Sequence, residues 1–143
     1  TDLEVTECME IQDILVGGER YHLLAQVGLD IRDLPKYPLL MLEEMSNTRR
    51  LTDCYAEENG VVLTPILELG SNDLLISFAK INLGLTFVIR EFTEQELRQR
   101  TLYEIPLYPP MPKRQIGRVR LKQVEAPHAV RGLITLMEEG FPK

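Results

Sequence analysis

The sequence has no long apolar run, and this sets several classes of protein aside. No stretch approaches the roughly 18–20 apolar residues that cross a bilayer, so we expect no contact with a membrane. The first residues, Thr1–Glu4, carry neither the basic nor the apolar segment of a signal peptide. We therefore expect a cytoplasmic protein. Because the chain also begins without Met, we expect it to be part of a longer one.

Cysteine is scarce as well. Cys8 and Cys54 are the two cysteines among the 143 residues, and they form no C-x-x-C pair. Such a pattern offers no metal site, and we expect neither a metal nor a cofactor. In a chain without a secretion signal we expect two reduced, half-buried thiols, with a disulfide as the alternative.

Positive charge is in deficit, because 16 Lys and Arg face 22 Asp and Glu and give a formal net charge of −6. Binding to nucleic acid is driven by cations that neutralise phosphates, so the chain is a poor candidate for contacting DNA itself. Arg118, Arg120 and Lys122 alternate along a predicted strand. We interpret them as a solvated or edge-protecting face in preference to a phosphate site.

Catalytic motifs are also missing. The sequence has no dinucleotide-binding fingerprint, no Walker loop, no nucleophile elbow and no zinc-protease motif. His22 and His128 are isolated in sequence, and nothing beside them would orient either as a general base. We therefore expect no enzyme.

The residues that are present predict an α/β fold with a largely parallel sheet flanked by helices. Four short apolar runs read as strands: 14–16, 39–42, 66–69 and 85–89. Helices separate these strands, and capping residues mark where the helices start: Ser46, Ser71 and the capping box Thr93–Glu96. The expected buried faces of the first two are Leu51, Cys54 and Tyr55, and Leu74, Leu75, Phe78 and Ala79.

Four prolines between Pro106 and Pro112 interrupt this alternation and predict an extended connector. A strand follows at Gln115–Lys122, and a last helix begins near Pro127. A stiff connector before one more strand and helix suggests that the chain passes from one lobe into another.

Two of the predicted strand ends lead into polar helix starts, at residues 43–49 and 70–72. Ligands of open parallel sheets bind beyond the carboxyl ends of strands, and a helix start attracts anions. Arg49 is unusual in such a first turn, because a cation there opposes the helix dipole. We weigh an i,i+4 ion pair with Asp53 against pairing with a bound carboxylate, and favour the ion pair.

The order of these segments resembles the effector domain of LysR-type transcriptional regulators. Asn82 stands where that family usually has Gly, which a left-handed helix end tolerates. The resemblance covers nearly the whole chain and rests on Tyr37–Glu43, Ser46–Arg49, Leu67–Leu75, Asn82–Val88 and Leu102–Leu107.

The resemblance implies a fold like that of type II periplasmic binding proteins, with two α/β lobes, two crossover strands and an effector in the cleft. Residues 13–105 would form the second lobe. Residues 1–12 would be the end of the first lobe and a crossover, and residues 106–143 the Pro-rich crossover with the returning strand and helix. The winged helix-turn-helix of the family is not in this chain, so DNA is a partner only through that absent domain.

By the same resemblance, the effector is a small molecule, a carboxylate or another anion, bound by Met45, Ser46, Asn47, Thr48 and, less firmly, Arg49. We also expect a homo-oligomer, with Leu74, Leu75 and Phe78 as a candidate dimer surface. The alternative is that these three side chains point into their own lobe. A solute-binding protein of a transport system, which shares the two-lobed fold, is the alternative function.

Overall fold

The computed structural model describes residues 3–121, with side chains from residue 9 to residue 117. The expected last helix and the position of Lys122 lie outside the described residues. The elements in chain order are β1 Leu3–Gly17, η1 Glu19–Tyr21, α1 His22–Val27, β2 Leu29–Asp30, η2 Ile31–Lys36, β3 Leu39–Leu42, α2 Asn47–Glu58, β4 Leu67–Leu69, α3 Asn72–Lys80, β5 Leu85–Ile89, η3 Arg90–Phe92, α4 Glu94–Arg98, β6 Tyr103–Ile105, β7 Leu107–Tyr108 and β8 Lys113–Leu121.

The main sheet has the strand order β4-β3-β5-β1-β6, and β8 pairs with β1 outside that path. β3 runs parallel to both β4 and β5, whereas β1 runs antiparallel to β5, β6 and β8. The strands other than β1 therefore share one direction, and β1 alone of this sheet runs against them. The α/β class predicted from the sequence is confirmed. A second, two-stranded sheet joins β2 to β7 in parallel.

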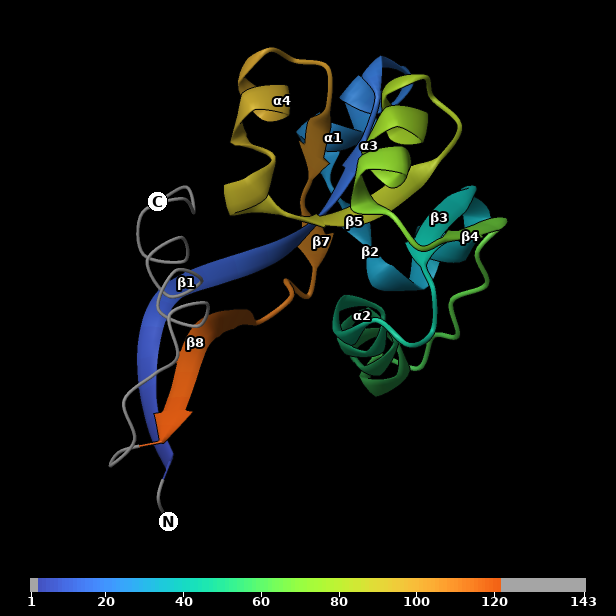
Figure 1. Cartoon of the computed structure of the whole chain (residues 1–143). Coiled ribbons are helices and arrows are strands. Elements are labelled where there is room, and N and C mark those ends of the chain that lie inside the picture. The colour runs from blue at the N-terminus through green and yellow to red at the C-terminus, as the bar shows by residue number, and fades with distance from the viewer. Residues whose placement is uncertain (1–2, 122–143) are drawn as a thin grey trace.

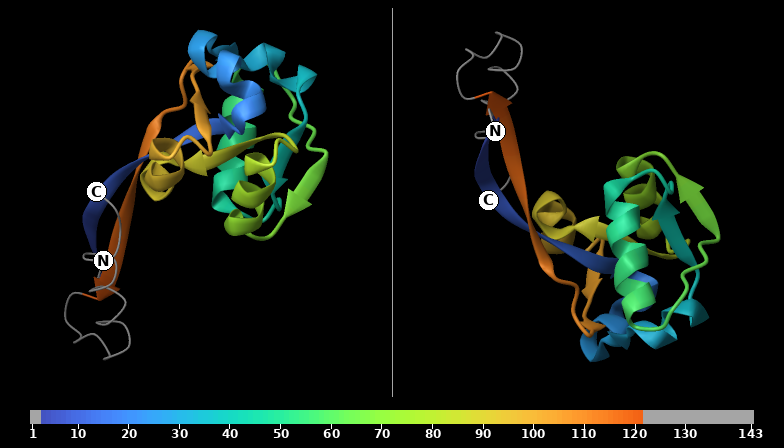
Figure 2. Two further views of the ribbon diagram at one scale, coloured as in Figure 1. Left: turned by 90° about the horizontal axis from the view of Figure 1, so that it is seen from above. Right: turned by 90° about the horizontal axis from the view of Figure 1, so that it is seen from below.

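β1 is one long strand with two sets of partners. From Leu3 to Gln12 it pairs with β8, and from Asp13 onward it pairs with β5 and then β6. The paired segments of β1 and β8 form a two-stranded arm that extends away from the rest of the molecule (Figures 1 and 2). We call the remaining part the lobe. The pairing in the arm shifts register between Glu7 and Met9, which marks a β-bulge.

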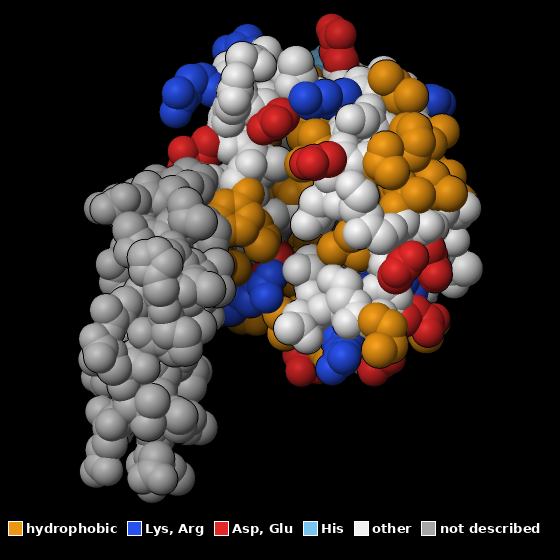
Figure 3. Space-filling view, in the orientation of Figure 1, with side chains coloured by type: hydrophobic (Ala, Val, Ile, Leu, Met, Phe, Trp, Pro, Cys, Tyr) orange, Lys and Arg blue, Asp and Glu red, His pale blue; other side chains and the backbone are white. Residues whose placement is uncertain are grey.

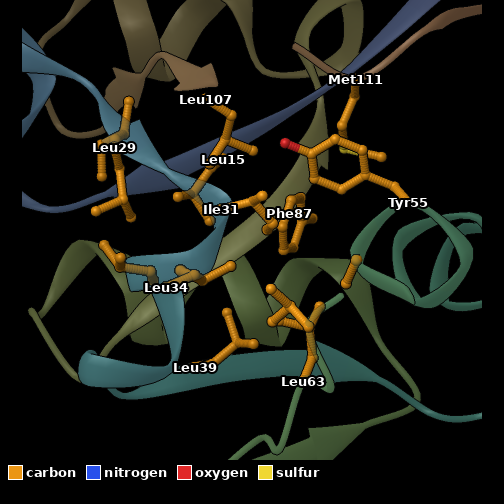
Figure 4. Close-up of a cluster of buried hydrophobic side chains, with 14 of the residues drawn as sticks. Leu15, Leu29, Ile31, Leu34, Leu39, Tyr55, Leu63, Phe87, Leu107 and Met111 are labelled. Carbon is orange, nitrogen blue, oxygen red and sulfur yellow. The ribbon is translucent and has the colours of Figure 1, made fainter. Parts of the chain in front are cut away.

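Side chains alternate between the faces of a strand, and both faces of the central sheet are covered. On one face, Leu15, Met41 and Phe87 pack with Tyr55 of α2 in the larger core, shown in Figure 4. On the other face, Ile14, Val16 and Val88 pack against Ala79 of α3 and Leu102, which follows α4. The lobe is thus a sheet between two layers of helices.

The two serine caps predicted from the sequence are confirmed. The Ser46 Oγ accepts from the backbone N–H of Arg49, and the Ser71 Oγ accepts from that of Leu74, each at 3.4 Å. The third predicted helix start is confirmed, because α4 begins at Glu94 with Thr93 at the N-cap position, but the predicted capping box is wrong, because the Thr93 side chain makes no capping bond. Its hydroxyl instead donates to the carbonyl of Ile89 at 2.6 Å, since η3 folds Thr93 back over the end of β5.

The predicted buried face of α2 is partly wrong. Thr52, Tyr55 and Ala56 are buried, but Leu51 is 42% exposed and Cys54 is an exposed free thiol. The helix is turned so that Tyr55 meets the larger core, which carries Leu51 and Cys54 toward solvent. The expectation of a half-buried thiol is therefore wrong for Cys54. Cys8 lies outside the residues with described side chains.

Two adjacent leucines of α3 give the first test of this packing. Leu75 is 0% exposed, whereas its neighbour Leu74 is 48% exposed. We expect Leu75→Ala to lower the free energy of unfolding by about 2–5 kcal/mol, because it leaves a cavity in the lobe. Leu74→Ala should cost less than about 1 kcal/mol. Urea denaturation of both variants measures the difference, and equal losses would contradict this orientation of α3.

Candidate functional site

A cavity opens where the carboxyl end of β5 meets the first turns of α2 and α3. It has a volume of about 250 Å³. Its polar lining comes from Thr48 in α2, Asn72 and Asp73 in α3, and Thr93. Its apolar lining is Ile76, Val88, Ile89 and Phe92. Ligands of open α/β sheets bind at this edge, and an apolar cavity with a few polar groups is typical of small-molecule sites.

The five residues predicted to bind a ligand have separate positions. Thr48 lines the cavity. Ser46 is half-buried and caps α2, as described above, while Asn47 is exposed at the start of the helix. Met45 is 82% exposed. The loop at residues 43–49 thus contributes Thr48 to the cavity lining. Asn72 comes from the second polar helix start, which the sequence analysis placed at residues 70–72.

The guanidinium of Arg49 is bound by other groups of the protein. The Arg49 side chain is 6% exposed, and its Nε donates to Asp53 Oδ2 at 3.0 Å. Its Nη1 donates to the carbonyl of Leu42 at 2.8 Å and to Glu68 Oε1 at 3.3 Å. The ion pair with Asp53, which we favoured from the sequence, is confirmed. The guanidinium joins α2 to the ends of β3 and β4, so it supports the site from within the protein.

A much smaller void of about 10 Å³ lies beside the cavity, and Thr48 lines both. Thr86 Oγ1 is buried at this void and has no hydrogen-bond partner among the residues that the structure describes. A void of this size is at the lower limit for a single water molecule. It is too small for an effector, so the larger cavity is the candidate site.

Sequence reasoning missed the charged pair that supports Thr48 from the arm. Arg114, the second residue of β8, donates from Nε to Asp13 Oδ2 at 2.8 Å and from Nη2 to Asp13 Oδ1 at 3.0 Å. The same Nη2 donates to Thr48 Oγ1 at 3.1 Å. Asp13 and Arg114 are 101 residues apart. The one signal in the sequence was an acid directly before the apolar run 14–16.

Tyr55 ties the other end of α2 to the Pro-rich connector. Its hydroxyl donates to the carbonyl of Pro109, and Figure 4 shows the ring reaching from α2 toward the segment that carries Met111. Burial, with a smaller effect of the negative charge of Asp30, raises the pKa of Tyr55 to about 12. The phenol therefore remains a hydrogen-bond donor throughout the physiological pH range.

The sequence matches the family model "LysR substrate binding domain" over residues 1–142. The chain belongs to this family. Within residues 3–121, no helix is long and apolar enough to span a membrane, and no group of three or more His, Cys, Asp or Glu side chains could hold a metal ion. A comparison with curated proteins gave no significant match.

Solved structures of regulators in this family share the fold. The regulatory domain of Synechocystis PCC6803 CcmR in complex with 2-PG is 16% identical, with a TM-score of 0.79 over 98% of this chain and 67% of that one. The effector-binding domain of QuiR in complex with shikimate is 16% identical, with a TM-score of 0.73 and coverages of 98% and 66%. HinK, a LysR family regulator from Pseudomonas aeruginosa, is 17% identical, with a TM-score of 0.73 and coverages of 99% and 50%.

The chain therefore spans about two thirds of the two regulatory domains and half of HinK. The family membership and these likenesses establish the fold of a LysR-type substrate-binding domain, which is of the type II periplasmic-binding-protein kind.

Two adjacent arginines test whether Arg49 serves the fold. Arg49→Gln removes a buried cation with three acceptors, so we expect the free energy of unfolding to fall by about 2–4 kcal/mol. Arg50→Gln changes an exposed neighbour and should cost less than about 0.5 kcal/mol. Chemical denaturation measures both. A loss for Arg49→Gln as small as that for Arg50→Gln would show that its contacts contribute little.

Proposed function

We propose that this chain is the effector-sensing part of a bacterial LysR-type regulator and that the effector binds in the cavity beside Thr48. The observation that carries the proposal is the position of this cavity, between the first turns of α2 and α3 at the carboxyl edge of the sheet, in a chain of this family. Neighbours of the same fold are described in complex with 2-PG and with shikimate.

The chemistry of the cavity favours a small molecule with an apolar body and an anionic group. Ile76, Val88 and Phe92 supply apolar wall. The first turn of α2, a helix of 12 residues, presents backbone N–H groups and the positive end of its dipole. The opposing charge, Asp73, lies in the first turn of α3, where it suits a hydroxyl or amine of the ligand better than a second anion.

The proposed mechanism is a shift between two arrangements of the lobes. We propose residues 13–105 as the second lobe, residues 1–12 and 106–143 as parts of the first lobe and the crossovers, and no catalytic activity. The change of β1 partners between Gln12 and Asp13 supports this division. A ligand that binds one arrangement more tightly moves the population toward it. DNA-binding domains outside this chain, in a cytoplasmic protein, would respond to that change.

Thr48 and a matched threonine test the site. We expect Thr48→Val to weaken effector binding about 5- to 10-fold, because a hydroxyl partner of the ligand is replaced by a methyl group of similar size. Thr101→Val, at an exposed position away from the cavity, should leave binding unchanged. Isothermal titration of the full-length protein with the ligands found by thermal-shift screening measures both, and unchanged affinity in Thr48→Val would exclude this cavity.

We further propose that the protein assembles as a homo-oligomer through the outer face of α3 and the loop after it. Figure 3 shows hydrophobic side chains gathered there. Leu74, Ile81 and Leu83 are 48%, 69% and 41% exposed, and Phe78 is half-buried. Leu75, which we had included in this surface, is fully buried in its own lobe and provides no contact. Contiguous exposed apolar side chains of this kind mark association surfaces.

A charge on this face tests the oligomer. We expect Leu74→Glu to shift the full-length protein toward smaller species in multi-angle light scattering, because an ionised carboxylate is costly to bury at an apolar interface. Leu23→Glu, on α1 at 64% exposure, is the matched control and should not change the mass. If Leu74→Glu keeps the mass of the wild type, the oligomer forms elsewhere or not at all.

A further inference from the structure

We infer that Arg114, on the returning strand β8, is the residue that selects an anionic group of the effector. The inference rests on the proposed function and names the cation of that site. The sequence offered Arg49 for this role, but the Arg49 guanidinium is buried and bound to Asp53, Glu68 and a backbone carbonyl. Arg114 reaches the same helix start from the arm, where its Nη2 lies 3.1 Å from Thr48 Oγ1.

Arg114 is held in place before any ligand arrives. Asp13, whose side chain is 2% exposed, binds Nε and Nη2 with its two oxygens. Such a two-point contact fixes the plane of the guanidinium. The Arg114 side chain is nevertheless 27% exposed, and it adjoins the cavity through its contact with Thr48, which lines it. The bonds to Asp13 and Thr48 engage Nε and Nη2, and Nη1 carries two further N–H groups.

The contact between Arg114 and Thr48 also determines how Thr48 meets a ligand. A hydroxyl has one proton to donate and lone pairs to accept. Because Thr48 Oγ1 accepts from Arg114, its own proton is available for an oxygen of the ligand. The guanidinium and the hydroxyl therefore form a pair of donors beside the cavity, which suits a carboxylate or a phosphate. Asp73, at the α3 side of the same cavity, opposes a second anionic group there.

Binding by the full-length protein tests this assignment with a defined set of probes. The set contains small carboxylates and phosphate esters, including shikimate and 2-PG, each beside its uncharged ester or amide. Thermal shift identifies the probes that bind, and isothermal titration gives their affinities for the wild type, Arg114→Gln, Arg114→Lys and Asp13→Asn. The control is Arg32→Gln, because Arg32 binds Asp30 through the same Nε and Nη2 atoms but is not among the residues that line the cavity.

We expect anionic probes to bind the wild type at least ten times more tightly than their uncharged counterparts. Arg114→Gln should lose this preference, Arg114→Lys should keep part of it, and Arg32→Gln should keep all of it. Asp13→Asn distinguishes a role of Arg114 in recognising the anion from a purely structural role of the Asp13–Arg114 pair. It leaves Arg114 with an unneutralised charge, so anion affinity should stay or rise, whereas a purely structural pair predicts that Asp13→Asn and Arg114→Gln weaken binding alike.

The inference is overturned if uncharged probes bind as well as anions, if no anion binds, or if Arg114→Gln keeps the wild-type preference. It is also overturned if Asp13→Asn and Arg114→Gln lose affinity equally. A failure of the proposed function gives a different set of results from a failure of this inference. If a probe binds and Arg114→Gln leaves its affinity intact, then a loss in Thr48→Val keeps the site and removes Arg114 from it. No loss in Thr48→Val removes the site itself.

Discussion

Asp13 is a buried carboxylate at the point where the arm enters the lobe, and a buried charge has to be paired. Its partner comes from the other end of the chain, because Arg114 is brought beside it by the pairing of β8 with β1. The pair fixes both strands of the arm against the lobe at one place. It also determines what lies next to the cavity, since the same guanidinium binds Thr48. The site and the arm therefore share one ionic contact.

The helix that carries Thr48 is anchored on three sides. Arg49 joins it to the ends of β3 and β4, Arg114 joins it to the arm, and Tyr55 joins it to the Pro-rich connector. A helix start used for recognition has to keep its orientation within narrow limits, which requires support around the contacting residue. Each of these anchors uses a polar group for a contact within the protein. Of the five residues that sequence reasoning grouped into one binding loop, Thr48 lines the cavity, Ser46 and Arg49 support the helix start, and Met45 and Asn47 are exposed.

Local chemistry made much of the lobe predictable. β3 and β5 have the expected bounds, and Ser46 and Ser71 cap the expected helices, because apolar runs and caps act over a few residues. The failures involve information that no short window contains. The rotation of α2 depends on where Tyr55 meets the core, and the hydroxyl of Thr93 is taken by the end of β5. Arg114 could not be assigned to the site without the register between β1 and β8, which joins residues about a hundred positions apart.

The position of Arg114 gives the proposed recognition a route to the rest of the protein. An anion held by a residue of α3 or α2 alone would report only to the lobe. An anion held by Arg114 contacts a strand of the arm, and within the arm the pairing is continuous from Lys113 to Leu121 except at the bulge between Glu7 and Met9. Asp13 and Arg114 hold the base of the arm against the lobe, and the ladder of the arm is interrupted at that bulge. On the proposed function, ligand binding at Arg114 would therefore act directly on a strand that joins the lobe to the arm, and so on the part of the chain that we propose belongs to the crossovers and the first lobe.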